Sequence, residues 1–587
     1  MSQPDRDLLH CFLPMTRAEM VARGWDALDI LLITGDAYVD HPSFAAALLG
    51  RFLEARGYRV GIIAQPNWRN PESLAVLGAP RLFVGICAGA LDSMLNLYTA
   101  NKKRRTRDAY SPGGRNDLRP RRATIVYTNL ARRVFPDTPI VIGGIEASLR
   151  RFAHYDYWDD RVRSSILLDS GADLLVYGMG ERAILAIARR LSQTKTARAL
   201  RYIPGTVFVG TERDLPQPAR CVWLPSREEI EKDAVKLLEA TRLALLHVNP
   251  YSRRYLVQAD EDRLVIATPP QPPLTTSEFD SLYELPFQRR EHWSYREPVP
   301  ALEPVRWSLT VQRGCYGGCT YCTLGVHQGK VIQSRSIGSI LREIESLAAM
   351  AAFRGTISDL GGPTANMYGT GGANPEVCRR CRRPSCLFPR ICRILRTDAR
   401  PLLKMLRAVR ESPSVRHAFI ASGVRYDLAL LQGDYLRTLV THHTGGHLSV
   451  APEHVVEHVL CLMARPPHSV FEKFRAAFHR YASEAGKELY LVPYFISSFP
   501  GCTEADMRQL RAYIRRTRLV THQVQDFIPL PMTMAAAMFY AGRTPEGRPI
   551  YVARTIAEKR RQQAYLRAPA RVFRGSRPVG RPPDDWG

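Results

Sequence analysis

Short apolar segments alternate with helical patterns along the first 200 residues, and this alternation restricts the possible folds more than any other feature. The segments that we interpret as buried strands are 29–34, 59–64, 81–87, 139–142 and 173–177. Apolar positions at helical spacing predict a helix over 41–56. Short apolar strands that alternate with helices indicate a parallel sheet with helices on both faces. We therefore predict an open, Rossmann-like α/β domain over residues 20–200.

A second α/β series begins near residue 301 and extends to about residue 565. Its expected strands are 305–311, 356–360, 417–421, 447–451, 488–495 and 523–528, with helices in the gaps. Six consecutive βα units predict a partial barrel of the TIM type, in which chemistry takes place at the carboxyl ends of the strands. Residues 201–300 are interpreted as a connecting region. Residues 566–587 are rich in Pro, Gly and Arg and predict a disordered basic tail.

The composition of the 587 residues limits the location and the partners of the chain. A net charge of +26 is compatible with nucleic-acid binding, but the basic residues are mostly Arg and are scattered through every segment. RNA is therefore a weakly supported partner. No run of 18 or more apolar residues is present, and the first 20 residues do not resemble a signal peptide. We expect a cytoplasmic protein with no membrane partner.

The twelve cysteines are unevenly distributed, because seven of them lie between positions 315 and 392. The remaining five, which we interpret as inert thiols, are Cys11, Cys87, Cys221, Cys461 and Cys502. Without a secretion signal, clustered cysteines favour metal binding over disulfides.

The first cysteine group has the spacing CxxxCxxC and follows the first strand of the second series. It consists of Cys315, Cys319 and Cys322. Soft thiolates select zinc or iron–sulfur clusters, and a structural zinc site would require a fourth ligand. Three thiolate ligands leave one coordination position open, and catalysis at a metal requires such an open position. The nearby Gly314, Gly317 and Gly318 allow the backbone to curl around a bulky cluster.

The second cysteine group contains four residues within fifteen positions: Cys378, Cys381, Cys386 and Cys392. Four thiolates complete the ligand set of a zinc ion or of an auxiliary iron–sulfur cluster. The spacing does not decide between the two metals. Such a closed site would be structural or would relay electrons to the first group.

The spacing CxxxCxxC with an aromatic residue before the last cysteine resembles the signature of the radical S-adenosylmethionine (SAM) superfamily. The resemblance implies that Cys315, Cys319 and Cys322 bind a [4Fe-4S] cluster, and that SAM chelates its fourth iron. It further implies that the reduced cluster cleaves SAM to methionine and a 5′-deoxyadenosyl radical, which removes hydrogen from a substrate. A one-electron reductant of the flavodoxin or ferredoxin type is the implied partner.

The same resemblance suggests further SAM-binding residues. Tyr321, just before the last cysteine, would flank the open iron. Gly361 and Gly362 resemble the glycine motif whose backbone meets the SAM amino group, although Pro363 replaces its usual acidic residue. Ser449 and Glu453 end the fourth strand, where the superfamily contacts the SAM ribose or carboxylate. Alternatively, Ser449 is only part of the sheet and Glu453 caps the next helix.

Both domains also resemble the YgiQ family of radical SAM proteins, whose reaction is not established. The resembling segments are 34–44, 143–151, 154–160, 327–330, 333–336 and 359–369. The N-terminal domain further resembles the cobalamin-binding domains found beside some radical SAM barrels. However, the DxHxxG sequence that supplies a cobalt ligand is missing, and its nearest analogue is Asp40-His41. The sequence therefore argues against His41 as a ligand and does not support cobalamin as a cofactor.

Three classes of function remain open. The leading hypothesis is a radical SAM enzyme that modifies RNA or a protein, or builds a small metabolite. The alternatives are a nucleic-acid-binding protein whose two cysteine groups hold structural zinc, and a SAM-binding scaffold without catalysis. The sequence does not identify the substrate, the catalytic acid or base, or the oligomeric state.

Overall fold

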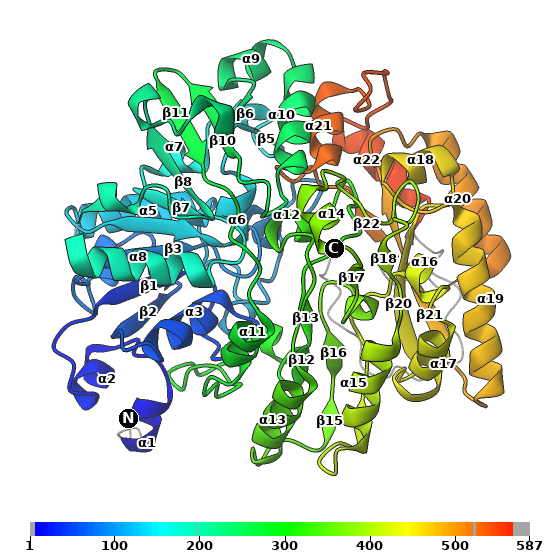
Figure 1. Cartoon of the computed structure of the whole chain (residues 1–587), viewed down its shortest axis with the longest axis horizontal. Helices are drawn as coiled ribbons and strands as arrows, with labels where there is room; N and C mark the ends of the chain where they lie inside the picture. The colour runs from blue at the N-terminus through cyan, green and yellow to red at the C-terminus, as the bar shows by residue number, and fades with distance from the viewer. Residues whose placement is uncertain (1–5, 195, 520–523, 567–587) are drawn as a thin grey trace. The chain divides into compact units, whose positions relative to one another are not determined.

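The computed structural model describes residues 6–194, 196–519 and 524–566 and divides into two compact units (Figure 1). The N-terminal unit takes in the chain up to Tyr98 together with Arg104–Arg306 and Val326–Gly329. The C-terminal unit consists of Thr99–Lys103, Trp307–Gly325 and the chain from Lys330 onward. Both are built from helices and strands, so the predicted α/β class is confirmed.

A nine-stranded sheet with the order β2-β1-β3-β4-β7-β8-β11-β10-β9 forms the centre of the N-terminal unit. Its parallel strands are β1 (Ile30–Thr34), β2 (Val60–Ala64), β3 (Phe83–Cys87), β4 (Ile140–Gly143) and β7 (Leu174–Val176). These are the five strands that the sequence predicts. All five residues of β1 are buried, as expected for a strand covered on both faces.

Helices on both faces of this sheet are required by its connections. Helix α3 (Ala45–Glu54) leads from β1 to β2, and α5 (Ala123–Val134) leads from β3 to β4 in the opposite direction along the sheet. Right-handed crossovers in opposite directions place their helices on opposite faces. Helix α8 (Glu181–Thr194) packs beside α3, and the short helix α7 (Ile166–Ser170) packs beside α5.

Residues 201–300 correct our prediction of a connecting region, because they supply four more strands to the sheet. These strands are β8 (Thr206–Gly210), β9 (Cys221–Leu224), β10 (Tyr255–Asp260) and β11 (Arg263–Ala267). Strand β8 lies antiparallel to β7, and β10 and β11 form a hairpin with the two-residue turn Glu261-Asp262. Glu261 adopts the left-handed backbone conformation typical of such turns, with φ 55°. Strands β7, β8, β11 and β10 pair antiparallel and β9 pairs parallel with β10, so this part of the sheet lacks the regular βα alternation that revealed the earlier strands.

The C-terminal unit contains the six strand regions that the sequence predicts, arranged in three parallel ladders. They are β12 (Ser308–Thr310) with β16 (Asp359–Gly361), β15 (Thr356–Ile357) with β19 (His417–Ala418), and β20 (His447–Glu453) with β21 (Tyr490–Ser497) and β22 (Val524–Asp526). The intervening helices are α13 (Ile337–Ala348), α15 (Arg400–Glu411), α17 (Gly433–His442), α19 (His468–Glu484) and α20 (Glu504–Thr517). Parallel pairing brings the carboxyl ends of neighbouring strands together.

Two predictions extend beyond the described part of the chain. Position 523 of the expected sixth strand and positions 567–587 of the expected tail lie outside the described residues. Within the described residues, no helix is both long and apolar enough to cross a membrane.

A buried ion cluster ties a long loop of the N-terminal unit to the carboxyl edge of its sheet. Arg119 is 1% exposed, and it donates from Nη2 to Asp36 Oδ1 at 2.7 Å and from Nε to Asp108 Oδ2 at 2.8 Å. It also donates to the carbonyl of Ala88, directly after β3. One guanidinium therefore compensates two buried carboxylates and holds three segments together.

We expect Arg119→Met to lower the free energy of unfolding by about 3–5 kcal/mol, because it leaves two buried carboxylates without a counter-charge. Chemical denaturation of the full chain measures this change. The matched control is Arg115→Met, because Arg115 pairs with Asp117 at the surface, where 55% and 57% of the two side chains are exposed. Loss of that pair should cost less than about 1 kcal/mol. Equal effects of the two substitutions would contradict the role assigned to Arg119.

Candidate functional site

The three cysteines of the first group lie in one tight loop at the carboxyl end of β12, just after the short strand β13 (Gln312–Arg313). Gly314 and Gly318 have left-handed φ angles of 89° and 66°. A Cβ atom would lie 2.2 Å from the carbonyl oxygen of Val331 at Gly314, and 2.6 Å from Ser385 Cβ at Gly318. Only glycine fits these positions, so the sequence prediction of a tightly curled loop is correct there.

The thiols of this loop lie close enough to influence one another electrostatically. Burial raises the pKa of Cys322 to about 12, with further contributions from Cys319 and Cys315. Three neighbouring thiolates in a buried site therefore require positive charge, which an iron–sulfur cluster supplies. Among the described residues, no three or more His, Cys, Asp or Glu side chains are arranged to hold a single metal ion. The chemistry of the three thiols nonetheless fits the ligand set of a cluster with one open position.

Two buried guanidinium groups approach the middle thiol, and sequence reasoning missed both of them. Arg425 Nη1 lies 3.3 Å from Cys319 Sγ, and Arg465 Nη1 lies 3.8 Å from the same atom. The residues are 5% and 4% exposed. Arg425 follows the predicted strand 417–421 and Arg465 follows α18 (Glu457–Leu462), each more than 100 positions from Cys319, so no local pattern marks them.

Arg465 carries a buried positive charge that interacts with the Glu453 carboxyl group without forming an ion pair. Within the described part of the chain it forms no ion pair, and its buried Nε has no hydrogen-bond partner. A buried cation with an unpartnered N–H group is costly unless an anion lies beside it. The surroundings of Cys319 therefore suit an anionic group.

Tyr321 and Glu453, which the sequence selects separately, are in direct contact. The Tyr321 hydroxyl donates to Glu453 Oε1 at 2.6 Å, and burial raises the pKa of this carboxyl group. Glu453 ends β20 with a left-handed φ of 68°, after a register shift that begins at Val450. A non-glycine residue in this conformation is uncommon, and at Glu453 it directs the carboxyl group toward Tyr321.

The sequence leaves open that Ser449 is only part of the sheet and that Glu453 caps the next helix, and the structure tests both points. The next helix, α18 (Glu457–Leu462), has Val456 at its N-cap, so Glu453 does not cap it. Ser449 lies within β20 opposite Val492, as the sheet-only reading expects. Its contact with SAM stays a prediction.

Gly361 and Gly362 are packed closely against the ends of neighbouring strands. A Cβ atom on Gly361 would lie 2.1 Å from Ser422 Oγ, and one on Gly362 would lie 2.7 Å from the carbonyl oxygen of Gln312. Asp359 accepts hydrogen bonds from the backbone N–H groups of Ala421 and Ser422, at 2.8 and 3.0 Å. The glycine motif therefore has little free space where it faces Ser422 and Gln312.

The second cysteine group packs directly against the first loop. Ser385 donates from Oγ to the Gly317 carbonyl at 2.7 Å, and the backbone N–H of Cys386 donates to the Tyr316 carbonyl at 3.0 Å. Cys392 N–H donates to the Cys386 carbonyl at 2.8 Å. Cys378 lies on helix α14 (Pro375–Arg380), and Cys381 follows it. Burial raises the pKa of Cys386, and the other three thiols of the group contribute.

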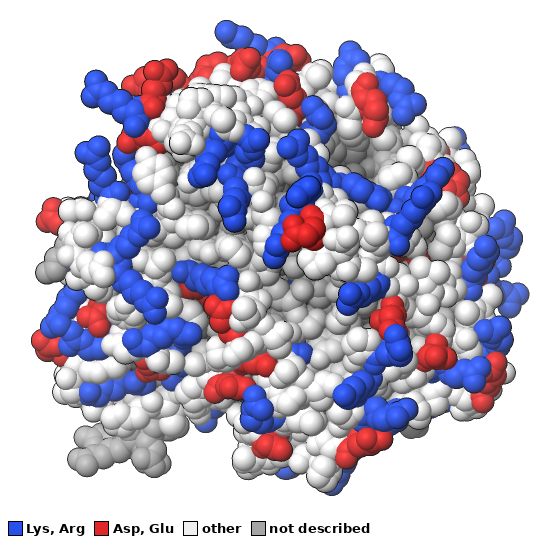
Figure 2. Space-filling view, viewed as in Figure 1, with Lys and Arg blue, Asp and Glu red and all other residues white. Residues whose placement is uncertain are grey.

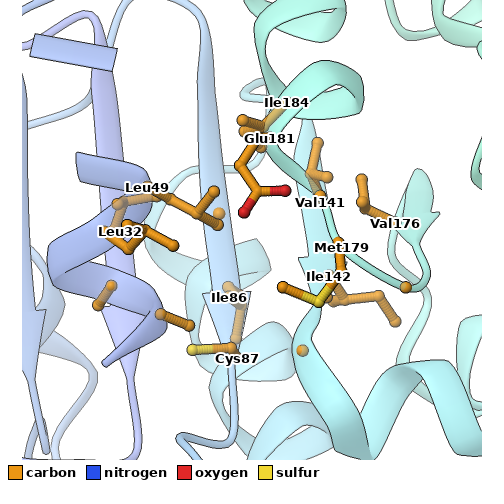
Figure 3. Close-up of a pocket in the computed structure, with 18 of the residues that line it drawn as sticks. Leu32, Leu49, Ile86, Cys87, Val141, Ile142, Val176, Met179, Glu181 and Ile184 are labelled. Atoms are coloured by element: carbon orange, nitrogen blue, oxygen red, sulfur yellow. The ribbon is translucent and has the colours of Figure 1, made fainter. Parts of the chain in front are cut away.

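A separate apolar cavity of about 120 Å³ opens at the carboxyl edge of the sheet in the N-terminal unit (Figure 3). The order of the strands reverses between β1 and β3, and both strands line the cavity. Ligands of open α/β sheets bind at such reversal points. Leu32, Ile86, Val141 and other apolar side chains form the walls, and the Glu181 carboxylate points in among them (Figure 3).

His41 does not line this cavity, and both of its ring nitrogens are engaged. Nδ1 accepts from the Ser43 N–H at 3.1 Å, and Nε2 lies 3.2 Å from Arg289 Nη1. The ring is 1% exposed. In this arrangement His41 is not available to ligate cobalt, as the missing motif indicates.

Lys and Arg are spread over the face of the molecule that Figure 2 shows, with Asp and Glu among them. This agrees with the scattered distribution in the sequence. Such a pattern on that face does not form the single basic patch that nucleic-acid binding typically requires.

The comparisons with known proteins identify the family of the chain. The family described as radical SAM N-terminal matches residues 12–308. The chain is 51% identical to the UPF0313 protein GSU2873 of Geobacter sulfurreducens, over 94% of this chain and 92% of that protein. It is 47% identical to a UPF0313 protein of Methanosarcina acetivorans, over 95% of this chain and 79% of that protein. The chain belongs to the UPF0313 family of YgiQ-type radical SAM proteins.

This UPF0313 chain also shares its fold with the radical SAM methyltransferase TsrM from Kitasatospora setae. The TM-score is 0.51 and the identity is 16%, over 91% of this chain and 85% of that one. The TsrM structure has cobalamin and a [4Fe-4S] cluster bound. At this identity the likeness concerns the fold, a cobalamin-domain-like unit with a radical SAM unit.

We expect Gly362→Ala to destabilise the C-terminal unit by about 1–3 kcal/mol, because the new methyl group meets a backbone oxygen that cannot rotate away. Thermal and chemical unfolding measure the change. Gly423→Ala is the matched control, since a Cβ atom at Gly423 would have no other atom within 4 Å. If both variants were as stable as the original chain, the close packing around the glycine motif would be wrong.

Proposed function

We propose that this chain is a radical SAM enzyme and that Cys315, Cys319 and Cys322 hold a [4Fe-4S] cluster. The observation that carries the proposal is the curled loop of three thiols at a strand end, with two buried guanidinium groups directed at Cys319. When bound, the cluster would supply the electron that cleaves SAM to methionine and a 5′-deoxyadenosyl radical. A one-electron reductant of the flavodoxin or ferredoxin type would provide that electron.

The chain's own residues would bind and orient SAM around this loop. We assign Tyr321 and Glu453 to one side of the SAM site, because their hydrogen bond links the cysteine loop to the end of β20. Gly361 and Gly362 end β16 and would present backbone groups to the SAM amino group. Arg425 and Arg465 would offset the negative charge of the thiolates and of the SAM carboxylate.

The substrate class is open, and two features of the molecule bear on it. The net charge of +26 is compatible with a polyanion such as RNA. The cavity of the N-terminal unit suits an apolar group of a smaller ligand. A cobalamin with His41 as the cobalt ligand is not part of the proposal, because both nitrogens of His41 are engaged.

We expect protein purified without oxygen to be brown and, after reduction with dithionite, to release 5′-deoxyadenosine from SAM. Cys315→Ala, Cys319→Ala and Cys322→Ala should each abolish this release, because each removes one cluster ligand. Chromatography measures the release of 5′-deoxyadenosine, and iron analysis measures the cluster content. Cys461→Ala, at an exposed thiol outside both groups, should behave as the unmodified protein does.

Two other outcomes would overturn the enzyme proposal. Colourless protein that contains zinc and does not cleave SAM would favour the zinc-containing nucleic-acid-binding protein. Brown protein that binds SAM but forms no 5′-deoxyadenosine, even with its reductant and substrate present, would favour the scaffold.

We further propose that Cys378, Cys381, Cys386 and Cys392 bind a second metal, either zinc or an auxiliary iron–sulfur cluster. The supporting observation is that their segment is hydrogen-bonded to Tyr316 and Gly317, beside the first ligand. A metal bound by these four cysteines would rigidify the segment that packs against the loop of Cys315, Cys319 and Cys322.

A chain in which Cys315, Cys319 and Cys322 are all replaced by Ala should therefore still contain metal. Additional replacement of Cys378 and Cys381 by Ser should remove it, as measured by elemental analysis for zinc and iron. Replacement of Cys221 and Cys461 by Ser in the same background is the control. Absence of both metals from the triple variant would refute the second site.

A further inference from the structure

Arg425 is held so that one of its N–H groups points at Cys319. Asp427 binds the opposite edge of the guanidinium in a fork, with Nε to Oδ1 at 2.9 Å and Nη2 to Oδ2 at 2.6 Å. The remaining nitrogen, Nη1, donates to Cys319 Sγ at 3.3 Å. Asn366 fixes the backbone of Arg425 from both sides, because it accepts from its N–H and donates to its carbonyl, each at 3.0 Å. The direction of Nη1 is therefore determined by two neighbours.

Arg465 approaches the same sulfur from a different segment of the chain. Its Nη2 donates to the Ala451 carbonyl, and its guanidinium lies 5.1 Å from the centre of the Tyr426 ring. Its Nη1 is 3.8 Å from Cys319 Sγ. Unlike Arg425, it has no carboxylate within ion-pair distance among the described residues. The Arg425–Asp427 pair is neutral overall, so Arg465 brings an additional positive charge beside Cys319, which the buried Glu453 carboxyl group offsets only in part because the two form no ion pair.

We propose that Arg425 and Arg465 raise the reduction potential of the cluster through the sulfur of Cys319, and that Asp427 is the positioning residue that directs Arg425. This rests on the proposed function of the three cysteines. Hydrogen bonds to a ligand sulfur and nearby positive charge stabilise the reduced cluster, which carries one more electron than the oxidised one. Burial strengthens both effects, because little water screens them. The step transfers one electron from the external reductant and neither forms nor breaks a bond in the protein.

The direct test is Arg465→Met in the reconstituted, full-length protein. This substitution removes the charge without breaking an ion pair, so the fold should be retained. In a redox titration followed by electron paramagnetic resonance, we expect the ratio of reduced to oxidised cluster at a fixed potential to fall about tenfold. For one electron, that corresponds to a midpoint about 59 mV more negative.

Two matched variants separate the proposal from simpler explanations. Arg437→Met removes a charge from the surface of the same unit, where Arg437 pairs with Glu484, and should leave the midpoint unchanged. Arg425→Lys keeps the charge but cannot bind Asp427 in a fork and reach Cys319 at the same time, so its midpoint should also fall. It also tests the proposal independently if Arg465→Met does not fold. A merely structural role would alter stability and leave the midpoint of the folded protein unchanged.

The outcomes distinguish this inference from the proposed function. If the unmodified protein forms no reducible cluster, the proposed function fails. If it forms one, and Arg465→Met and Arg425→Lys have its midpoint, the cluster stands and the role of the two arginines is refuted.

Discussion

The loop between Gly314 and Cys322 is held by hydrogen bonds from segments far away in the sequence, and the candidate site depends on them. Ser385 binds the Gly317 carbonyl, and Cys386 binds that of Tyr316. Thr320 donates to the Leu462 carbonyl at 2.7 Å, and its own carbonyl accepts from the Ala535 N–H at 3.0 Å. Glycine gives the loop its shape, but these distant segments fix it in place. A loop held from several sides can present three sulfurs in one arrangement before any cluster is bound.

The electrostatics of this site follow from burial. Three thiolates inside the unit are unfavourable alone, and so is the unpaired guanidinium of Arg465. Each lowers the free-energy cost of burying the other, and a bound cluster with SAM would complete the charge balance of the site. Glu453 belongs to the same balance, because its carboxyl group is buried near Arg465 and accepts from Tyr321. The left-handed backbone of Glu453 is then a local cost that is offset by placing this carboxyl group beside the loop.

How far the sequence predicts the structure depends on the range of the interactions. The parallel strands of the N-terminal unit were predictable because burial on two faces leaves a continuous apolar run, as in β1 (Ile30–Thr34), whereas β20 and β21 of the C-terminal unit show alternating burial and were predictable from their place between helices. Strands β8 to β11 were missed although β8 and β11 are largely buried too, because they join the sheet by mixed antiparallel and parallel pairing that a regular βα alternation does not predict. The cysteine loop was predictable from local spacing. Arg425 and Arg465 were not, because no local pattern indicates that a side chain more than 100 positions away reaches Cys319.

Arginine shows why composition alone could not locate the function. The chain has 82 Lys and Arg residues, and scattered arginines are what a compositional bias produces. Yet several are buried in specific ion pairs, such as Arg51 with Asp40 and Arg119 with Asp36, where a planar guanidinium bridges a carboxylate and backbone carbonyls. Arg425 uses the same geometry with Asp427, but its third edge meets a thiol rather than a carbonyl. A guanidinium suits this position because it can hold a carboxylate on one edge and donate from another. The same residue type thus stabilises the fold in one unit and is directed at the proposed cluster in the other.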